Sequence, residues 1–269
     1  MIRRGHNGLA FYQFASLSAR PEVVHAVFTR LGGSSQGHFR SLNVGQRVGD
    51  NPQAVQTNHE LVFSSLSLEP SDVVTAQQVH GARVAVVGAD HHGAVLPSTD
   101  ALLTQSVNTY LLMRFADCLP LMLYDPMHQA IALAHCGWRG LLAGVVPNTV
   151  RALHLTFGSQ PAEMLAALGP SIRPCCYEVG ADVIQPVKRL FGSSEALLAR
   201  QPDGSVHFDL PGAVRIQLQQ LGLHHIEDSS LCTACRTDEF FSHRAESGNT
   251  GRFAALIGLR ESGGHPEMP

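Results

Sequence analysis

Four short apolar segments follow one another closely in the middle of the chain, with turn residues between them. They are Ala101–Thr104, Tyr110–Phe115, Leu119–Tyr124 and Ala130–Ala134. Apolar runs of this length, bounded by turn signals, are typical of buried strands. Four of them so close together predict the core of a β-sheet.

Helical patterns lie on both sides of this predicted sheet. Asp50-Asn51-Pro52 predicts a helix that runs to about Ser65, because Pro is favoured in a first helical turn. The other predicted elements are helices at Leu141–Phe157 (interrupted at Pro147), Ala181–Phe191 and Pro211–Leu221, and strands at Val23–Phe28, within Val73–Val87 and at Phe253–Leu259. No linker or repeat separates them. We therefore predict one α/β (mixed α+β) domain over residues 1–269, with a mixed β-sheet core at about 23–260 flanked by helices.

The composition excludes several classes of protein. A hydrophobic fraction of 44% and a charged fraction of 15% over 269 residues fit a globular core and not a disordered chain. The net charge of −3 argues against a nucleic-acid partner. No apolar stretch has the length of a membrane span or a signal peptide, so we expect a cytoplasmic protein with no membrane partner.

Three side chains at the edges of predicted strands form a candidate metal site. His80 follows Gln78-Val79, Cys118 precedes the third apolar segment, and His135 ends the fourth. Each lies beside Gly or Pro or one residue away, where a bend can turn a side chain into a pocket. Two imidazoles and one thiolate suit zinc and leave its fourth position open for chemistry.

The same residues allow a second interpretation. Cys118 could be a nucleophile that His80 or His135 activates, with Asp117 orienting the base. The two interpretations place the chemistry at one point and differ in whether the thiolate binds an ion. The sequence leaves both open.

Arginine is the residue most suited to hold an anion in this chain, because Lys188 is the only lysine. Arg139 follows Trp138 in the turn after His135, and Arg30 and Arg244 lie in similar loops. We predict that these three arginines and the glycine-rich turns form a rim that binds phosphate or carboxylate.

The remaining cysteines occur mainly in two pairs. Cys232 and Cys235 form a Cys-x-x-Cys motif, and Cys175 and Cys176 are adjacent. A structural zinc shared between the pairs is one interpretation. Neither pair has a partner at zinc-ribbon spacing, so free thiols are the favoured interpretation.

A series of motifs along the chain resembles the YfiH-like family, also described as a multicopper polyphenol oxidase (laccase) family and as a purine nucleoside phosphorylase family. The motifs are Thr29-x-x-Gly32-Gly33-Ser34, Ser41-Leu42-Asn43, Gly49-Asp50, Gln78-Val79-His80-Gly81, Asp117-Cys118-x-Pro120, His135-Cys136-Gly137-Trp138-Arg139-Gly140, Gly169-Pro170, Tyr177-Glu178-Val179, Cys232-Thr233 and Ser242-x-Arg244. Together they span almost the whole chain.

This resemblance implies a cysteine-hydrolase-like fold and a zinc-dependent enzyme, with copper as another metal. The implied enzyme phosphorolyses adenosine, inosine, guanosine and 5′-methylthioadenosine with inorganic phosphate, and deaminates adenosine. The implied ligands are His80, Cys118 and His135. Cys118, Arg30 and Arg139 are the predicted catalytic residues, and Asn43, Gln78 and Arg244 the predicted substrate-binding residues.

The resemblance also implies two other activities, peptidoglycan-precursor amidase activity and copper-dependent oxidation of phenols. The sequence argues against the second, because a multicopper oxidase needs roughly ten ligands in His-rich paired motifs. No His-x-His occurs in this chain. The chain also departs from the common family pattern at His59 and Ser171, which affects expected specificity but not the three ligands.

Overall fold

The computed structural model describes residues 1–192 and 196–261. Its strands are β1 (Ile2–His6), β2 (Leu9–Gln13), β3 (Val23–Phe28), β4 (Val73–Ala76), β5 (Val84–Val86), β6 (Val95–Leu96), β7 (Ala101–Thr104), β8 (Thr109–Phe115), β9 (Leu119–Asp125), β10 (Ala130–Cys136), β11 (Leu165–Leu168), β12 (Leu198–Arg200), β13 (Val206–Phe208), β14 (His225–Asp228) and β15 (Phe253–Leu259). Its α-helices are α1 (Ala15–Ser18), α2 (Pro52–Ser65), α3 (Trp138–Ala143), α4 (Val145–Phe157), α5 (Ala181–Phe191) and α6 (Leu210–Gln220).

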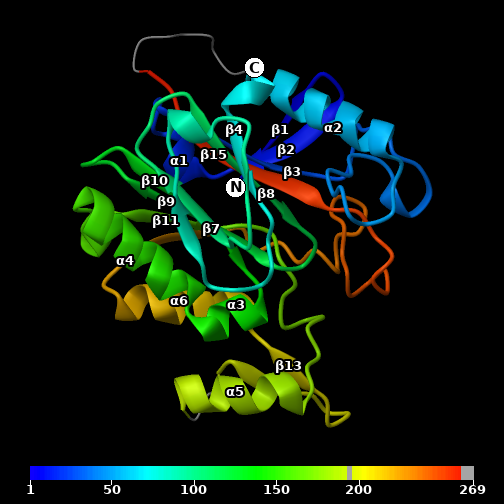
Figure 1. Cartoon of the computed structure of the whole chain (residues 1–269). Helices are drawn as coiled ribbons and strands as arrows, with labels where there is room; N and C mark the ends of the chain where they lie inside the picture. The colour runs from blue at the N-terminus through cyan, green and yellow to red at the C-terminus, as the bar shows by residue number, and fades with distance from the viewer. Residues whose placement is uncertain (193–195, 262–269) are drawn as a thin grey trace.

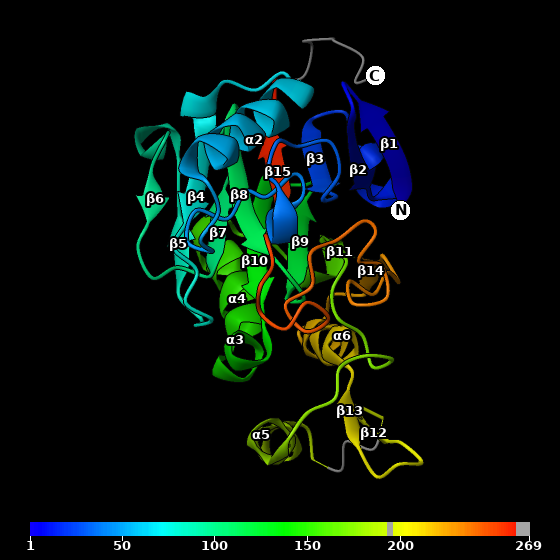
Figure 2. The same ribbon diagram turned by 90° about the vertical axis from the view of Figure 1, so that its right-hand side faces the viewer.

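Two mixed sheets form the centre of the molecule. One has the strand order β1-β2-β3-β15-β8-β4-β6 and the other β14-β11-β9-β10-β7-β5. Helix α2 covers the first sheet, whereas α3, α4 and α6 cover the second (Figure 1). Helix α5 and the β12–β13 hairpin lie beyond that helical layer (Figure 2). The prediction of a single mixed α+β domain is confirmed, and a relation to cysteine hydrolases stays a prediction.

The alternating direction of side chains along the central strands explains this arrangement of sheets and helices. In β10, Ala132 and Ala134 pack toward the helices, while Ile131 and Leu133 pack between the two sheets. Successive side chains of a strand point to opposite faces, so His135 continues the row that lies between the sheets. Both faces of this strand are buried, which is why its sequence is continuously apolar.

Most predicted elements match the structure to within one or two residues. One difference is the break between α3 and α4. It falls at Gly144, which has a φ of 93°, and not at Pro147, which lies in the first turn of α4. Proline is tolerated there because backbone N–H groups in the first turn of a helix have no carbonyl partner within the helix, so its missing N–H costs no hydrogen bond. Another difference is the hairpin of β1 and β2, which the sequence pattern did not indicate.

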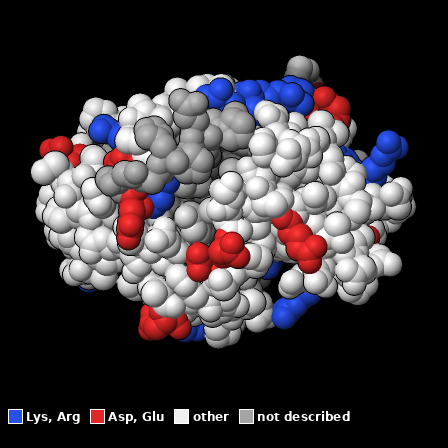
Figure 3. All heavy atoms as spheres, turned by 90° about the horizontal axis from the view of Figure 1, so that it is seen from above, with Lys and Arg blue, Asp and Glu red and all other residues white. Residues whose placement is uncertain are grey.

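No α-helix in the described ranges is long and apolar enough to cross a bilayer. On the face seen from above, uncharged side chains cover most of the surface and the acidic groups lie apart from one another (Figure 3).

Candidate active site

The three predicted metal ligands come together at one end of the two sheets. His80 lies in the loop after β4, Cys118 between β8 and β9, and His135 near the end of β10. The Nδ1 or Nε2 and Sγ atoms of the three residues lie within 4.8 Å of one another. His135 is buried, Cys118 is partly buried and His80 is exposed. The group therefore has a protein-facing side and an open side.

Asp100 holds the two histidines in position. Its carboxylate accepts hydrogen bonds from the backbone N–H of His80 (2.9 Å) and Gly81 (2.8 Å), and from Nδ1 of His135 (2.8 Å). If Nδ1 of His135 carries this proton, its Nε2 is free to bind a metal. Burial raises the pKa of Asp100, but the hydrogen bonds from His135 and Gly81 outweigh this and lower it.

Asp117 has a structural role beside the cluster. Its carboxylate accepts hydrogen bonds from Thr233 Oγ1 (2.7 Å) and from the backbone N–H of Arg244 (2.7 Å). The carboxylate that orients His135 is therefore Asp100, and the assignment of Asp117 to this role is wrong. Asp117 instead fixes the turn that presents Cys118.

Two site residues have a left-handed backbone, with φ of 59° at His80 and 82° at Asp117. This conformation is unfavourable for a residue with a side chain and persists only where surrounding contacts impose it. Here the Asp100 carboxylate holds the first turn, and the bonds to Thr233 and Arg244 hold the second.

Two glycines of the His135–Gly140 hexapeptide allow the close approach of these loops. A Cβ atom at Gly137 would lie 2.9 Å from Sγ of Cys118 and 3.1 Å from Cδ2 of His80. At Gly140 it would lie 2.7 Å from the carbonyl oxygen of Gly81. The hexapeptide therefore needs glycine where α3 meets the His80 loop and the thiol.

Cys118 and His135 perturb each other. Burial raises the pKa of Cys118, but His135 and His80 lower it to about 6 through charge and hydrogen bonding. Burial lowers the pKa of His135, but the Cys118 thiolate and Asp100 raise it to about 9. Without a metal the pair is thus a thiolate and an imidazolium near neutral pH. A divalent ion would replace the imidazolium proton.

The cluster opens into a pocket of about 570 Å³. Asp117 is the one acidic side chain in its lining. The lining also contains five arginines, which are Arg47, Arg114, Arg139, Arg244 and Arg252. Gln78, Trp138 and Tyr177 also contribute to the wall. An excess of arginines over a single carboxylate favours an anionic ligand.

The predicted anion-binding residues differ in their availability. Arg139 is exposed, stacks on Trp138 at 4.5 Å and donates no hydrogen bond to another described residue. Arg244 stacks on Tyr177 at 5.2 Å and donates to the carbonyl of Glu178. Both can turn toward a ligand in the pocket.

The structure does not bring Arg30 or Asn43 to the pocket wall. The Arg30 guanidinium contacts the Glu246 carboxylate (3.0 Å) and the carbonyls of Arg40 and Thr237. Asn43 is buried and bonds Asp50 and backbone groups of its own loop and of Arg252. Asn43 belongs to a family motif, whereas Arg30 was predicted from its glycine-rich loop, and both side chains hold loops together here.

Gln78 lies on the pocket wall with its amide already paired. Its Nε2 donates to the carbonyl of Arg114 (2.8 Å) and its Oε1 accepts from the N–H of the same residue (3.0 Å). The side chain thereby extends the pairing between the β4 loop and β8. It can shape the pocket without breaking these bonds.

This is a single-domain α+β protein with a His–Cys–His cluster at the base of an arginine-lined pocket. The chain belongs to the YfiH family, whose family model is described as multi-copper polyphenol oxidoreductase laccase and matches residues 24–260. The crystal structure of Bacillus licheniformis hypothetical protein YfiH has a TM-score of 0.89 and 32% sequence identity, covering 96% of this chain and 99% of that one.

Curated relatives carry a different functional name. Purine nucleoside phosphorylase SCO2081 of Streptomyces coelicolor is 39% identical over 87% of this chain and 95% of its own length. Purine nucleoside phosphorylase YlmD of Bacillus subtilis is 34% identical, over 90% of each chain.

Proposed function

We propose that this protein is a zinc-dependent purine nucleoside phosphorylase of the cytoplasm that also deaminates adenosine. The observation that carries the proposal is the position of the His80–Cys118–His135 cluster at the base of a pocket lined by five arginines. The names of the relatives support the phosphorylase part of this proposal. The substrates would be adenosine, inosine, guanosine and 5′-methylthioadenosine, with inorganic phosphate and without a nucleic-acid or membrane partner.

The donors of the cluster fit zinc. Two imidazoles and a thiolate that is already favoured near neutral pH match a borderline-soft divalent ion, and copper could bind the same set. Zinc held there would supply a Lewis acid with one open position. Asp100 would keep Nε2 of His135 directed at the ion through its hydrogen bond to Nδ1.

The arginines supply the phosphate site in this mechanism. Arg139 and Arg244 would hold inorganic phosphate so that one of its oxygens attacks the anomeric carbon of the ribose. The new C–O bond forms as the C–N glycosidic bond breaks, and the purine leaves with the bonding electron pair. It takes up one proton, which balances the proton that hydrogen phosphate loses on becoming the sugar phosphate. Positioned positive charge stabilises phosphate in the transition state and aligns it with the carbon. Arg30, which is bound to Glu246, has no part in this mechanism.

The candidate ligands argue against oxidation of phenols by several coppers. In the described part of the chain, the groups able to hold a metal are this cluster and a set of four cysteines. Together they contain two histidines, whereas a multicopper centre needs several histidine-rich sites.

A cysteine-type hydrolase, such as an amidase for peptidoglycan precursors, is the second candidate. One observation favours it. Without any metal, the Cys118 thiolate, the His135 imidazolium and the Asp100 carboxylate follow one another as the nucleophile, base and orienting acid of a catalytic triad do. The two candidates differ in metal dependence. Zinc should inhibit the hydrolase, because it occupies the nucleophile, and should activate the phosphorylase.

The test is to incubate zinc-loaded protein with adenosine, with and without phosphate, and to separate the products by chromatography. Adenine and ribose 1-phosphate should form only with phosphate, and inosine with or without it. Arg139→Gln should raise the phosphate concentration needed for half-maximal rate about ten-fold, because one charge-assisted contact is lost. No turnover of any nucleoside by the zinc-loaded protein would reject the proposal.

A further inference from the structure

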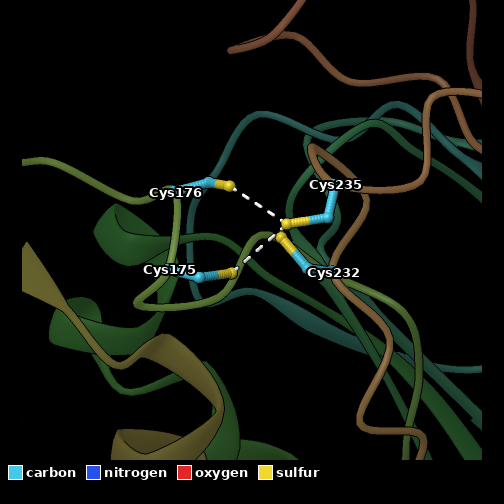
Figure 4. A group of neighbouring side chains, drawn as sticks. All are labelled: Cys175, Cys176, Cys232 and Cys235. Carbon is cyan, nitrogen blue, oxygen red and sulfur yellow. Dashed lines mark hydrogen bonds between the residues drawn. The ribbon is translucent and has the colours of Figure 1, made fainter.

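Four of the six cysteines converge on one point outside the pocket. Cys175 and Cys176 come from the turn before Tyr177, and Cys232 and Cys235 from the loop after β14. Figure 4 shows the side chains of the two pairs directed at one another from opposite loops. Their four Sγ atoms all lie within 4.8 Å of one another. The two pairs, which sequence spacing offers no reason to combine, are therefore a single group.

The sulfur spacing is that of a metal site and not of a disulfide. Sγ of Cys235 lies 3.3 Å from Sγ of Cys176 and 3.5 Å from Sγ of Cys175. A disulfide requires about 2.05 Å and joins only two sulfurs. Four thiolates around zinc at about 2.3 Å form a tetrahedron whose edges are roughly 3.8 Å. These two separations need a change of only a few tenths of an ångström to reach that geometry, and all six lie within 4.8 Å.

The backbone already holds the two loops in register. Cys232 pairs with Ser171 in an isolated β-bridge, in which the N–H of Thr233 donates to the carbonyl of Ser171 (3.1 Å). The N–H of Cys176 donates to the carbonyl of Arg173 (2.8 Å), which closes the turn that carries Cys175. The cluster is thus prearranged by contacts that do not involve sulfur.

We propose that these four cysteines bind one structural zinc ion, separate from the ion at His80, Cys118 and His135. With four thiolates its coordination is closed, so it serves the fold and not catalysis. The cytoplasmic location proposed for the protein would keep the thiols reduced and available for the ion.

The proposed ion would fasten two loops that support the active site, one that lines the pocket and one that contacts Asp117. Tyr177 follows Cys176 directly and lines the pocket beneath the Arg244 guanidinium. Thr233 follows Cys232 directly and donates its hydroxyl to Asp117, next to Cys118. Joining these loops through one ion would keep both residues in place when the pocket fills.

Zinc stoichiometry tests the proposal without any assay of activity. Reduced protein saturated with zinc and freed of excess ion should contain two zinc ions per chain by elemental analysis. Cys235→Ser should contain one, and His80→Ala should also contain one. Ala234→Ser, which adds a hydroxyl in the same loop without removing a sulfur, is the matched control and should retain two.

Cobalt identifies which site is filled. In His80→Ala, the one remaining Co²⁺ should show the strong thiolate-to-metal charge transfer and tetrahedral d–d bands of a four-sulfur site, and Cys235→Ser should lose most of that charge transfer. A single zinc in wild type that disappears in His80→Ala would overturn the proposal.

If Cys235→Ser does not fold, alkylation of the cysteines in wild-type protein, with and without zinc, tests the proposal instead. In wild-type protein, zinc should slow alkylation of all four cysteines at least ten-fold, as peptide mass spectrometry would measure. Equal labelling with and without zinc, or a disulfide within the cluster under reducing conditions, would contradict a metal site.

Discussion

The described part of the chain contains two groups of soft ligands that differ in composition and in surroundings. The His80–Cys118–His135 cluster has three donor atoms and is open to the pocket on one side. Asp100 orients its histidines through hydrogen bonds. The cluster of four cysteines has four donors of one kind and lies outside the pocket lining. Three donors leave a coordination position for chemistry, whereas four thiolates close it.

The two groups also differ in the charged side chains that surround them. Around the first cluster, five arginines line the wall and Cys118 and His135 shift each other's pKa in opposite directions. Around the second, burial and neighbouring thiols raise the pKa of Cys175 and Cys176, but the group lies outside the pocket lining. Perturbed titratable groups in a cleft indicate function. The comparison therefore assigns catalysis to the first group and stability to the second, and four variants or measurements can break or sharpen it.

Cys118→Ser should have the largest effect. Removing the thiolate takes one of three ligands from an open site, and the Lewis-acid contribution of a metal amounts to several kcal/mol. Phosphorolysis should fall on the order of 10³-fold or more, since each 1.36 kcal/mol changes a rate ten-fold. Deamination should fall with it if one ion serves both. The measurement is the rate of adenine and inosine formation by zinc-saturated enzyme.

Zinc content sharpens the same experiment. Cys118→Ser should lose one zinc per chain and keep the ion assigned to the four cysteines, with the thermal midpoint of unfolding little changed. Retention of phosphorolysis in this variant would separate the two activities and reject the single catalytic site. Loss of both ions would show that the two groups are not independent.

Gly137→Ala tests how tightly the first cluster is packed. The added methyl would lie 2.9 Å from Sγ of Cys118, so the thiolate or the His80 loop must move. Misplacement of reacting groups by about 1 Å costs on the order of 10²-fold in rate. Gly5→Ala is the control, because its Cβ would meet nothing closer than 3.7 Å. Wild-type activity in Gly137→Ala would contradict the packing argument.

The first cluster could be predicted from the sequence and the second could not. His80, Cys118 and His135 follow or precede apolar runs whose pattern places strand ends together. Adjacent Cys175 and Cys176 do not have the spacing of a known zinc motif. Tertiary contacts such as the Ser171–Cys232 bridge and the Arg173–Asp228 ion pair bring their turn to the second pair. That bridge is a tertiary contact between irregular segments, which local sequence does not encode.

Asp100 was missed for a related reason. It precedes β7 directly and resembles an ordinary turn residue, yet the pairing of β7 with β10 sets it beside His135. The β1–β2 hairpin was missed because β1 is mostly exposed, with charged residues and a glycine, so the sequence offers no apolar run to pair with β2. Arg30, predicted from its glycine-rich loop, and Asn43, predicted from a family motif, lie off the pocket wall and hold loops together.

Asp100→Asn should have an intermediate effect on the first cluster and none on the second. An amide can still accept from one donor, but it loses the charge that favours the proton on Nδ1 of His135 and cannot bond the His80 loop equally well. Outer-layer partners of this kind contribute roughly 10- to 100-fold to metal affinity or activity. Competition with a zinc chelator would measure the affinity. Unchanged affinity would show that Asp100 serves only the fold.

The smallest expected effect is on the rate at which the thiols are alkylated in metal-free protein. With a pKa of about 6 instead of 9, Cys118 is about 90% thiolate at pH 7, against about 1% for an ordinary thiol. Its intrinsic nucleophilicity falls by roughly 20-fold over those three units, because reactivity depends on pKa with a slope of about 0.45. The net gain in alkylation rate at pH 7 is then only about four-fold.

The shape of the pH profile distinguishes the two groups more clearly than the rate does. Because the pKa of Cys118 is lowered, its alkylation should be constant at neutral pH and decline as the pH falls through about 6. Burial raises the pKa of Cys175 to about 11, so its alkylation should still be increasing above pH 9. Peptide mass spectrometry after brief treatment with iodoacetamide would resolve both curves in one sample. In His135→Gln the inflection of Cys118 should move upward, because the imidazolium that stabilises the thiolate is gone; an unmoved inflection would show that His135 does not activate the thiol.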